Sequence, residues 1–596
     1  MILIGGYNMA RKIFYDFEVF MYDWMVILID YDTRTEKVIV NDVNELRRVY
    51  SKHKNDIWIG YNSRMYDQFI MKGTLHGLDP AWVNHRLIID GIPGWQIHSC
   101  MGGLYPFNNF DVSTGFHSLK QLEGFMGENI KESSVPFDIE RKLTDTEIEE
   151  VIEYCRHDVE QTIKVFEATK SEFDAQLALI DAFELPSKLF NKTKAQLSAH
   201  ILGAERSFAH RNDEFDFTIV DTLRLDKYKH IAQWFDEPEN KRYNRPSPTG
   251  KTTIALKQRE EIWGVPHDIG YGGIHGAIKQ YQGEGLFIMS DIASMYPATM
   301  INYNFLSRNV SDPDKFRQIR DDRIVLKRQK DPKQLPYKIV LNSTYGASKD
   351  KHNPLYDPLM ANNVCINGQL LIVDLLEKLE AGLGDNAQLI QSNTDGILVK
   401  LRNRSYYDEY LRICKEWEER SMFELEHDEY VKVFQKDVNN YVIIDAKGKY
   451  KSKGAYVKKL NKIDYDLPIV NKALIDYLVY DIPVEETINK CDDLIEFQKV
   501  SKITSLYAAS MHGDKVLNER VLRVFASNIG LPGVSKIKIV VDKQGNKTER
   551  IEKIGNTPES CFIVNDNIIG TKVPPILDKT WYIDLAKKRL TDFLGR

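Results

Sequence analysis

Four acidic residues and one tyrosine in the first third of the chain have the types and spacing of a metal-dependent hydrolytic site. Asp16 and Glu18 are two residues apart in a strand-like segment, so their carboxylates share one face. Asp67 follows a second strand-like segment, and Tyr154 and Asp158 are four apart on one face of a helical segment. Carboxylates that repel one another favour a bound cation, and oxygen ligands suit Mg²⁺ or Mn²⁺. The set predicts a two-metal site for phosphodiester hydrolysis, in which Tyr154 holds the attacking water.

A second pair of acids lies in the middle of the chain. Asp291 ends an apolar segment, and Asp395 lies between Thr394 and Gly396 at a turn between two strand-like segments. Two interpretations of Asp395 stand at this point. Because Asp and Gly suit turns, it is either a turn residue or one half of a metal site whose other half lies elsewhere.

The order of the first set, on strand, strand and helix, resembles a known family. Asp-x-Glu, then Asn-x₃-Tyr-Asp, then Tyr-x₃-Asp is similar to the three exonuclease motifs of the DnaQ-like 3′→5′ proofreading domain, tyrosine subtype. The resemblance implies that the four acids ligate two Mg²⁺ ions and that Tyr154 positions water. Asn62 and Tyr66 fall on the second motif, where DNA contacts are implied. Taken singly, an acid pair on a strand is common, and Asp158 also suits a solvated helix face.

The second pair lies in blocks that resemble family B DNA polymerases. D-x-x-S-x-Y-P, from Asp291 to Pro297, is similar to the first polymerase motif of that family. K-x₃-N-S-x-Y-G starts 47 residues later at Lys338 and is similar to the second motif, on the fingers helix. SNTDG stands at the place of the family's D-T-D hairpin. The resemblance implies that Asp395 meets Asp291, with Ile292 also at the metal site, and that two further Mg²⁺ ions bind there, with Mn²⁺ as a substitute.

Residues for the nucleotide follow from these blocks and from helix geometry. Lys338, Asn342 and Tyr345 share one helical face, where Lys338 supplies a point charge for a triphosphate. Gly346 lets the backbone approach the nascent base pair, and the ring of Tyr296 is placed to exclude a 2′-hydroxyl. A basic helical stripe upstream is either a phosphate site or a surface helix with ion pairs. The expected nucleotide-binding residues are Ser294, Met295, Tyr296, Arg323, Lys327, Lys338, Asn342, Tyr345 and Gly346.

The chain departs from the family pattern at the hairpin. Asn393 replaces the first Asp of D-T-D, and Gly396 replaces the Ser that follows the motif. Two carboxylates and a triphosphate of roughly −4 already balance two Mg²⁺ ions. We therefore expect polymerisation to persist with Asn393 as a hydrogen-bonding neighbour, and Asn393→Asp to change rate or metal preference only modestly.

Three segments are expected to contact primer-template DNA. Tyr271, Gly272 and Gly273 match the family's Tyr-x-Gly-Gly turn one position off, and Tyr441 matches part of its Lys-x-Tyr motif. The stretch from Lys447 to Lys462 has seven lysines and no acid, and on a strand its alternate lysines share one face. This stretch is either a track for a phosphate backbone or a solvated edge strand. The lysines expected to contact DNA are Lys449, Lys451 and Lys453.

The elements that must position these residues indicate several domains in a chain of 596 residues. Strand-like and helix-like segments alternate up to about residue 170, and Thr144 and Glu147 form a capping-box pattern before a long helix. We expect α/β and α+β domains, with an RNase H-like exonuclease followed by a right-hand polymerase. The expected parts are 8–200, exonuclease; 201–262, helical connector and linker; 263–306 and 346–440, palm; 307–345, fingers; 441–596, thumb and C-terminal region. A hairpin over 535–551 and a final helix over 577–595 are also expected.

Composition bears on location and partners. Six cysteines without a Cys-x-x-Cys pair suit a reducing cytoplasm, and no membrane span or secretory signal is expected. The net charge of −6 disfavours a general nucleic-acid binder, although it averages over local basic stretches. We expect a cytoplasmic monomer, in the host-cell cytoplasm if a bacteriophage encodes it, that binds primer-template DNA and deoxynucleoside triphosphates. A helicase, clamp or single-strand-binding protein is a candidate further partner.

The sequence thus predicts a compact, bacteriophage-like family B DNA polymerase with a proofreading exonuclease. The intervals between the polymerase motifs, 47 and about 51 residues, are too short for the insertions of protein-primed enzymes, so a nucleic-acid primer is expected. Three alternatives stay open: an active exonuclease with a weak polymerase half, a non-catalytic DNA-binding scaffold, and a ribonucleotide polymerase. Unpaired buried acids are costly, which disfavours the scaffold.

Overall fold

The computed structural model describes residues 10–100, 105–113, 115–186, 189–207, 214–541 and 547–595. The chain divides into two compact units. The first comprises Met1–Asn191, Leu460–Val470 and Glu485–Leu585, and the second comprises Lys192–Lys459, Asn471–Val484 and Ala586–Arg596. The region 441–596, expected as one thumb and C-terminal region, is therefore divided between the two units, because most of its residues after 484 pack with the N-terminal part of the chain.

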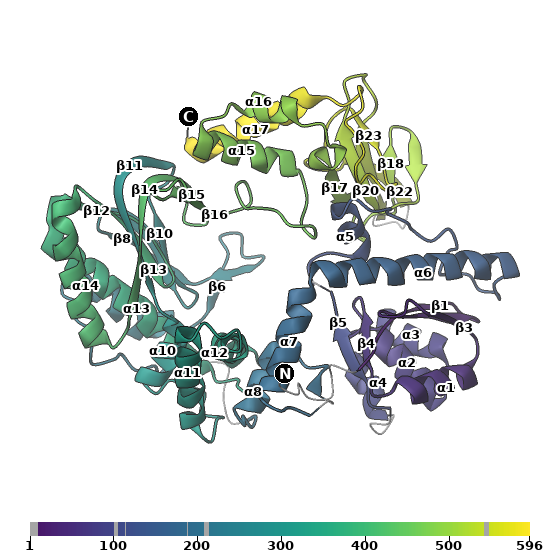
Figure 1. Cartoon of the computed structure of the whole chain (residues 1–596), viewed down its shortest axis with the longest axis horizontal. Coiled ribbons are helices and arrows are strands. Elements are labelled where there is room, and N and C mark those ends of the chain that lie inside the picture. Colours follow the sequence, from purple (N-terminus) through teal and green to yellow (C-terminus); the bar gives the residue numbers. More distant parts are fainter. Residues whose placement is uncertain are drawn as a thin grey trace. The chain divides into compact units, whose positions relative to one another are not determined.

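A five-stranded sheet is the centre of the N-terminal part of the first unit (Figure 1). Its strand order is β3-β2-β1-β4-β5, in which β1 pairs antiparallel with β2 and parallel with β4. The strands are β1 Lys12–Val19, β2 Trp24–Asp30, β3 Glu36–Val40, β4 Ile57–Gly60 and β5 Asn108–Asp111. The helices of this part are α1 Val43–His53, α2 Asp67–His76, α3 Pro80–Ile88, α4 Gly94–Cys100, α5 Leu119–Phe125, α6 Asp145–Ala168 and α7 Lys170–Ala182.

Alternation along β1 gives this sheet two different faces. Tyr15 belongs to a buried core that also contains residues of α2, α3 and α4. Phe14, Asp16 and Glu18 lie on the other face, where the ring centroid of Phe14 is 5.3 Å from that of Phe166 in α6. Helix α6 packs on β1 and β2. The two acids of β1 therefore lie between the sheet and α6.

The start of α6 has the predicted capping box. Oγ1 of Thr144 accepts a hydrogen bond from the main-chain N of Glu147 at 3.3 Å, and Oε2 of Glu147 accepts one from the main-chain N of Thr144 at 2.8 Å. The prediction of this helix start is confirmed. Because 3.6 residues make one turn, the start fixes which later residues of α6 face β1.

The first unit also contains a C-terminal β region, residues 494–577, built from two small sheets. One has the order β17-β20-β23 and the other the order β19-β18-β21-β22. The strands are β17 Lys499–Lys502, β18 Ala509–His512, β19 Lys515–Leu517, β20 Val521–Ala526, β21 Val534–Val541, β22 Lys547–Lys553 and β23 Cys561–Ile563. The antiparallel pair of β21 and β22 confirms the predicted hairpin. Helix α5 packs on β17 and β20.

The second unit is built on nine antiparallel strands in the order β16-β15-β14-β11-β13-β12-β10-β9-β8 (Figure 1). The strands are β8 Lys257–Ile262, β9 Val265–Gly270, β10 Gly273–Ala277, β11 Tyr281–Ile292, β12 Ala387–Asn393, β13 Gly396–Leu401, β14 Leu425–Asp437, β15 Asn440–Ile444 and β16 Tyr450–Lys453. The central strands β11 and β13 are far apart in sequence and adjacent in the sheet, so the fold joins distant motifs.

Helices α13, Pro358–Leu383, and α14, Tyr407–Ser421, pack beside this sheet. Trp417 of α14 donates from Nε1 to the carbonyl O of Leu371 in α13 at 3.1 Å, and the hydroxyls of Tyr410 and Ser290 lie 2.6 Å apart. Within the described ranges, α13 with its continuation to Asn386 is the one helix that has the length and apolarity of a membrane span. Of its most apolar window, 89% is buried inside the protein, as in a core helix.

Helices α11, Pro313–Arg328, and α12, Gln334–Lys349, pack side by side. The helical conformation predicted for the basic stripe and for the block from Lys338 is confirmed. The other helices are α8 Lys194–Ile201, α9 Lys229–Asp236, α10 Met295–Asn302, α15 Pro468–Tyr480, α16 Val484–Lys490 and α17 Lys579–Leu594. Helix α17 confirms the predicted final helix. The short elements are β6 Asn244–Pro246, β7 Thr253–Ala255 and the 3₁₀ turns η3 Pro238–Asn240, η4 Gly384–Asn386, η5 Arg404–Tyr406 and η6 Leu494–Phe497.

The expected helical connector over 201–262 differs from the structure. Apart from the end of α8, α9 is the one α-helix among the described residues of this range, and β8 at its end is the edge strand of the nine-stranded sheet. Gln258 and Ile262 of β8 are buried, while the strand residues between them are charged and partly or fully exposed. With a single apolar residue in the strand, hydrophobic alternation gave no signal for it.

Candidate active sites

The four acids of the first unit converge beside β1. Asp16 and Glu18 lie on the strand face that α6 covers, and Asp158 is on α6 itself. Asp67 is the first residue of α2, and its Oδ1 accepts a hydrogen bond from the main-chain N of Phe17 at 3.1 Å. This bond ties the start of α2 to β1, so the fold brings the expected acids together.

These carboxylates are close enough to change one another's charge. Burial, followed by the charges of Asp67, Glu18 and Asp158, raises the pKa of Asp16 well above its usual range. Burial and then Asp158 raise the pKa of Glu18, and burial raises the pKa of Asp67 to about 7. A buried, oxygen-rich and negatively charged donor set of this kind fits a hard divalent cation such as Mg²⁺ or Mn²⁺.

A lysine that no sequence pattern indicated completes this cluster. Nζ of Lys120 in α5 forms ion pairs with Asp158 and Glu123, the latter at 3.1 Å. The same Nζ lies 4.6 Å from the centre of the Tyr154 ring. Lys120, Glu123 and Asp158 are all buried. Neither the spacing nor the composition of α5 connects Lys120 to Asp158, so only the tertiary fold reveals the pair.

Tyr154, Asn62 and Tyr66 lie near the cluster in different settings. Tyr154 is half-buried one turn before Asp158, and burial and then the charges of Asp158 and Glu18 raise the pKa of its hydroxyl. Asn62 is exposed before α2, with a φ of 56°. The Tyr66 hydroxyl donates to Oδ1 of Asn84 at 2.9 Å. Tyr154 thus lies near the acids, with Lys120 over its ring, and Asn62 is open to solvent.

Asp291 and Asp395 meet at one end of the nine-stranded sheet. Asp291, near the end of β11, pairs with Gly396 of β13, and Asp395 lies in the turn between β12 and β13. The main-chain N of Ile292 donates to the carbonyl O of Asp395 at 2.8 Å. Burial and then the charge of Asp395 raise the pKa of Asp291 to about 6. The two acids also line one cleft of about 190 Å³, so the expected pair is adjacent.

This second donor set also fits a divalent cation. Two exposed carboxylates line the same cleft, and partial desolvation raises the pKa of both. Ile292 has only main-chain atoms to offer a metal, and its N is already bonded to Asp395, so its carbonyl O is the one available ligand atom. Oxygen ligands of this kind suit Mg²⁺.

Gly396 lies directly against the carboxylate of Asp291. A Cβ added to Gly396 would be 2.0 Å from Oδ1 of Asp291, and a real Cβ cannot come that close. The departure from the family's serine at this position therefore has a physical reason, because the side chain of Asp291 occupies the space that a serine would need.

We expect Gly396→Ser to lower primer extension by about 100-fold, because it displaces the Asp291 carboxylate by roughly an ångström. Single-turnover extension of a labelled primer measures the rate, and thermal unfolding checks that the fold is intact. The matched control is Gly555→Ser, since a Cβ at Gly555 meets nothing within 4 Å. Extension by Gly396→Ser at the rate of the wild type would show that the contact with Asp291 is unimportant.

Asn393 is held by two hydrogen-bond partners next to the acid pair. Its Oδ1 lies 3.1 Å from Nδ1 of His275, and its Nδ2 donates to the carbonyl O of Val438 at 3.3 Å. An aspartate has no donor for Val438 and would add a third negative charge to the cleft. The amide therefore suits the hydrogen bonds that this position makes.

Tyrosines and an arginine surround the start of α10. The rings of Tyr296 and Tyr345 are stacked, with centroids 3.9 Å apart and planes inclined at 14°. Nη1 of Arg323 in α11 donates to Oγ of Ser294 at 3.1 Å. Ser294 has a φ of 54°, in the left-handed region that few residues other than glycine adopt. The fold therefore joins the expected nucleotide-binding residues of α10, α11 and α12.

The remaining residues expected at the nucleotide differ in exposure. Nζ of Lys327 lies 3.2 Å from Oε1 of Glu426, which is the strand partner of Asp291. Lys338, Asn342 and Gly346 are exposed on α12. Met295 is buried at the start of α10. The exposed residues of α12 are free to meet a ligand, whereas Met295 is a packing residue in this structure.

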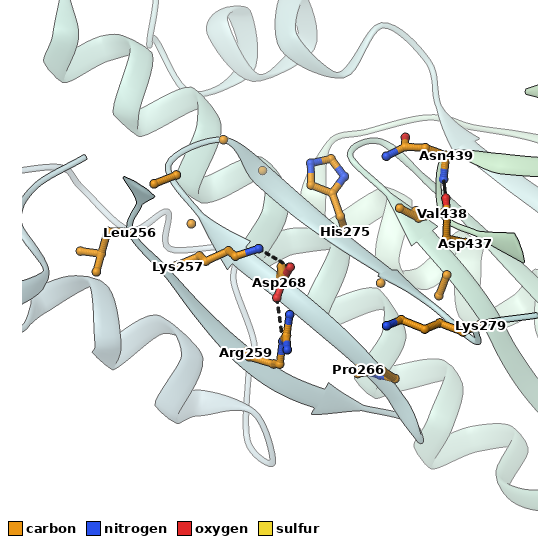
Figure 2. Close-up of a pocket in the computed structure, with 16 residues that line it drawn as sticks. Leu256, Lys257, Arg259, Pro266, Asp268, His275, Lys279, Asp437, Val438 and Asn439 are labelled. Carbon is orange, nitrogen blue, oxygen red and sulfur yellow. Dashed lines mark hydrogen bonds and ion pairs between the residues drawn. The ribbon is translucent and has the colours of Figure 1, made fainter. Parts of the chain in front are cut away.

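A groove of about 500 Å³ lies along β8, β9 and β10 and the turn between β14 and β15 (Figure 2). Gly272 and Gly273 line it together with Lys279 and Asn439. The Tyr271 side chain is instead buried, and its hydroxyl donates to the carbonyl O of Asn240 at 3.0 Å. Its ring is therefore part of the core, and the two glycines are the part of this motif that faces the groove.

The lysine-rich stretch presents two residues on a strand, fewer than expected. Lys451 and Lys453 of β16 line the cleft of Asp291 and Asp395, with Tyr441 of the neighbouring strand. Lys449 lies before β16, in a turn closed by a hydrogen bond from the main-chain N of Asp445 to its carbonyl O at 2.9 Å. The turn places Lys449 outside the strand, so the expected strand face is wrong for Lys449, whereas Lys451 and Lys453 line the same cleft.

Comparison with known proteins gives three findings. The chain matches no protein-family model. Over 197 residues it is 26% identical to DNA polymerase 1 of Sulfurisphaera ohwakuensis, and the match covers 33% of this chain and 21% of that protein. It also matches the structure of the family B DNA polymerase from the hyperthermophilic archaeon Pyrobaculum calidifontis, with a TM-score of 0.40 and 14% identity over 98% of this chain and 78% of that one. The sequence match confirms the predicted resemblance to DNA polymerases.

Proposed function

We propose that this chain is a family B DNA-dependent DNA polymerase that extends a nucleic-acid primer by two-metal nucleotidyl transfer and proofreads with a 3′→5′ exonuclease. The observation that carries the proposal is the meeting of Asp291 and Asp395 in one cleft. Tyr345 of the K-x₃-N-S-x-Y-G block stacks on Tyr296, which follows Asp291 in the chain. Primer-template DNA and deoxynucleoside triphosphates are the proposed partners.

In the polymerase site, the two aspartates and the carbonyl O of Ile292 would hold divalent ions. Bound there, such ions neutralise a triphosphate and favour the attack of a 3′-hydroxyl. Arg323 and Lys338 bring positive charge to the phosphates from α11 and α12. Arg323 can replace its hydrogen bond to Ser294 by one to a phosphate oxygen at little cost, because the side chains of Arg323 and Ser294 are polar and partly solvated.

For the DNA, we propose a path over the cleft and the groove of Figure 2. Lys451 and Lys453 reach the backbone phosphates next to the catalytic acids, where counterion release favours binding. Gly272 and Gly273 permit close approach of a strand to the main chain, because neither has a side chain. Tyr441 presents its half-buried ring to the primer end.

In the nuclease site, Asp16, Glu18, Asp67 and Asp158 would hold the ions, and the Tyr154 hydroxyl would hold the attacking water. Lys120 forms an ion pair with Asp158 that opposes the rise in the Asp158 pKa caused by burial, and it restricts the Tyr154 ring by lying over its face. The support for this part of the proposal is the convergence of the four carboxylates, whose pKa values rise through burial and mutual repulsion.

The test of the proposal uses the purified full chain and one labelled primer-template. With Mg²⁺ and deoxynucleotides the primer is expected to lengthen, and with Mg²⁺ alone it is expected to shorten from its 3′ end. Chelation of the metal should stop both reactions. A chain that binds DNA but does neither would support the scaffold alternative, and shortening without extension would support the exonuclease with a weak polymerase half.

Replacing Tyr296 by alanine is expected to raise ribonucleotide use relative to deoxyribonucleotide use by about 100-fold, because the ring is placed to exclude a 2′-hydroxyl. Single-nucleotide insertion with each substrate gives the ratio. Tyr296→Phe keeps the ring stacked on Tyr345 and serves as the control with the wild-type ratio. If the wild-type chain already prefers ribonucleotides, the RNA polymerase alternative is favoured.

A further inference from the structure

The short helix α5 ends inside the first unit, where the last carbonyls of a helix have no partner within the helix. Arg523 of β20 donates from Nη2 to three carbonyl oxygens, those of Glu123 at 3.3 Å, Gly124 at 3.1 Å and Glu128 at 2.6 Å. Gln498 donates from Nε2 to the carbonyl O of Phe125 at 2.9 Å. Two side chains of the C-terminal β region therefore supply the partners that the end of α5 lacks.

Arg523 is a buried charge that depends on these carbonyls. Its side chain is fully buried, and its Nη1 donates to the carbonyl oxygens of Val564 at 3.4 Å and Asp566 at 2.7 Å. A buried charge is costly unless hydrogen bonds compensate, and the carbonyl end of a helix carries partial negative charge. The guanidinium and the end of α5 thus stabilise each other.

The other side of α5 reaches the nuclease acids. Lys120 pairs with Asp158 and with Glu123, and Nε2 of His157 lies 3.6 Å from Oε1 of Glu123. Lys120, Glu123 and the three carbonyls that accept from Nη2 of Arg523 all belong to residues 120–128. One short segment therefore joins the buried arginine to a carboxylate of the nuclease site.

Close packing also holds the backbone of α5 against the C-terminal β region. A Cβ at Gly124 would be 2.8 Å from Cγ1 of Val500 in β17, so the helix backbone lies directly on that strand. The main-chain N of Ile568 also donates to the carbonyl O of Gly127 at 2.9 Å. The backbone of residues 124–127 therefore contacts the C-terminal β region at two further points.

We propose that Arg523 is a positioning residue of the nuclease site, which acts through the end of α5 and through Lys120 on the carboxylate of Asp158. Of the measurements that test this proposal, only the rate of DNA degradation rests on the proposed nuclease function. It assigns residues 494–577 to the nuclease, as the support of one of its helices, although they lie more than 300 positions after the last nuclease motif.

The test compares Arg523→Met, Arg523→Lys and the wild-type full chain. Hydrogen exchange of the amides of residues 119–128 is expected to accelerate in Arg523→Met and to recover in part in Arg523→Lys, since lysine keeps the charge and three donors. Degradation of single-stranded DNA is expected to lose about 10- to 100-fold in kcat with little change in KM, because reacting groups move while the DNA contacts stay. Primer extension should stay at the wild-type rate.

Tyr582→Phe is the matched control. The buried Tyr582 hydroxyl accepts a hydrogen bond at 3.1 Å from the main-chain N of Ala526, which lies in β20 like Arg523. This variant is expected to lower the unfolding temperature without accelerating exchange in α5 or lowering kcat. If Arg523→Met does not fold, Arg523→Lys and Gln498→Leu carry the test, and each should accelerate exchange in α5.

A further comparison is the double variant Lys120→Met with Arg523→Met. If Arg523 acts through Lys120, the second substitution should add no further loss of kcat to the first. Additive losses, or unchanged exchange in α5 in Arg523→Met and Arg523→Lys, overturn the proposal. A wild-type chain that does not degrade DNA refutes the nuclease function, and the exchange of α5 then still decides whether Arg523 positions this helix.

Discussion

We expect Asp291→Asn to lower primer extension by about 1,000-fold or more and to leave 3′→5′ degradation at the wild-type rate. Asparagine has the shape of aspartate, so the pairing of β11 with β13 and the contact with Gly396 stay in place. The charge that would hold a cation next to Asp395 is lost. Single-turnover extension with Mg²⁺ and deoxynucleotides measures the first effect, and shortening of the same labelled primer without nucleotides measures the second.

The matched control for this variant is Glu284→Gln, which removes one negative charge from the same strand. Glu284 is exposed and pairs with Lys432 at 3.3 Å, far along β11 from Asp291. Extension by this control should equal that of the wild type. Unimpaired extension by Asp291→Asn would refute the polymerase assignment, and loss of both activities in a folded variant would refute the separation of the two sites.

Asp16→Asn is expected to have the reciprocal effect, with degradation lower by about 1,000-fold or more and extension unchanged. Asp16 lies among Glu18, Asp67 and Asp158, whose charges raise its pKa. Removal of its charge leaves too few carboxylates to hold a pair of ions. The rate of primer shortening in Mg²⁺ is the measurement, and Glu149→Gln on the exposed side of α6 is the control.

The same variant has a second expected effect that needs no catalysis. The pKa of Asp67 is raised from 3.8 to about 7, so between these pH values the folded state binds protons that the unfolded chain has lost. The free energy of unfolding therefore falls as the pH rises through this interval. Asp16 repels Asp67 and the other two carboxylates of the cluster. In EDTA at pH 8, where no metal ion offsets this repulsion, Asp16→Asn should therefore raise the unfolding temperature. A lower unfolding temperature would mean that the acids do not repel one another.

Local signals accounted for a large part of this structure. The capping box at Thr144 marked the start of α6, and the strand ends at Asp291 and Asp395 came together as their motifs predicted. These features depend on residues near one another in sequence or on motifs with fixed spacing. The strand β8 was missed because it has one apolar residue to bury, and its position is set by pairing with β9.

The parts of the sites that the sequence did not reveal depend on long-range contacts. Lys120 meets Asp158 only because α5 packs beside α6, and the buried ring of Tyr271 belongs to an aromatic cluster with Phe215, Phe235 and Tyr243. No periodicity or spacing encodes either arrangement. Gly396 was visible as a departure from the family pattern, but its reason appeared only with the position of the Asp291 side chain.

The distance along the chain between α5 and its arginine has a consequence during protein synthesis. Arg523 lies 400 positions after Glu123. A ribosome that adds about 5 to 20 residues per second needs about 20 to 80 s to cover that interval. For most of that time, from the addition of Asp158 onward, the nascent chain holds the four acids of the first unit without the guanidinium that fixes α5, so we expect the proposed DNA degradation to run below its full rate until Arg523 has been added.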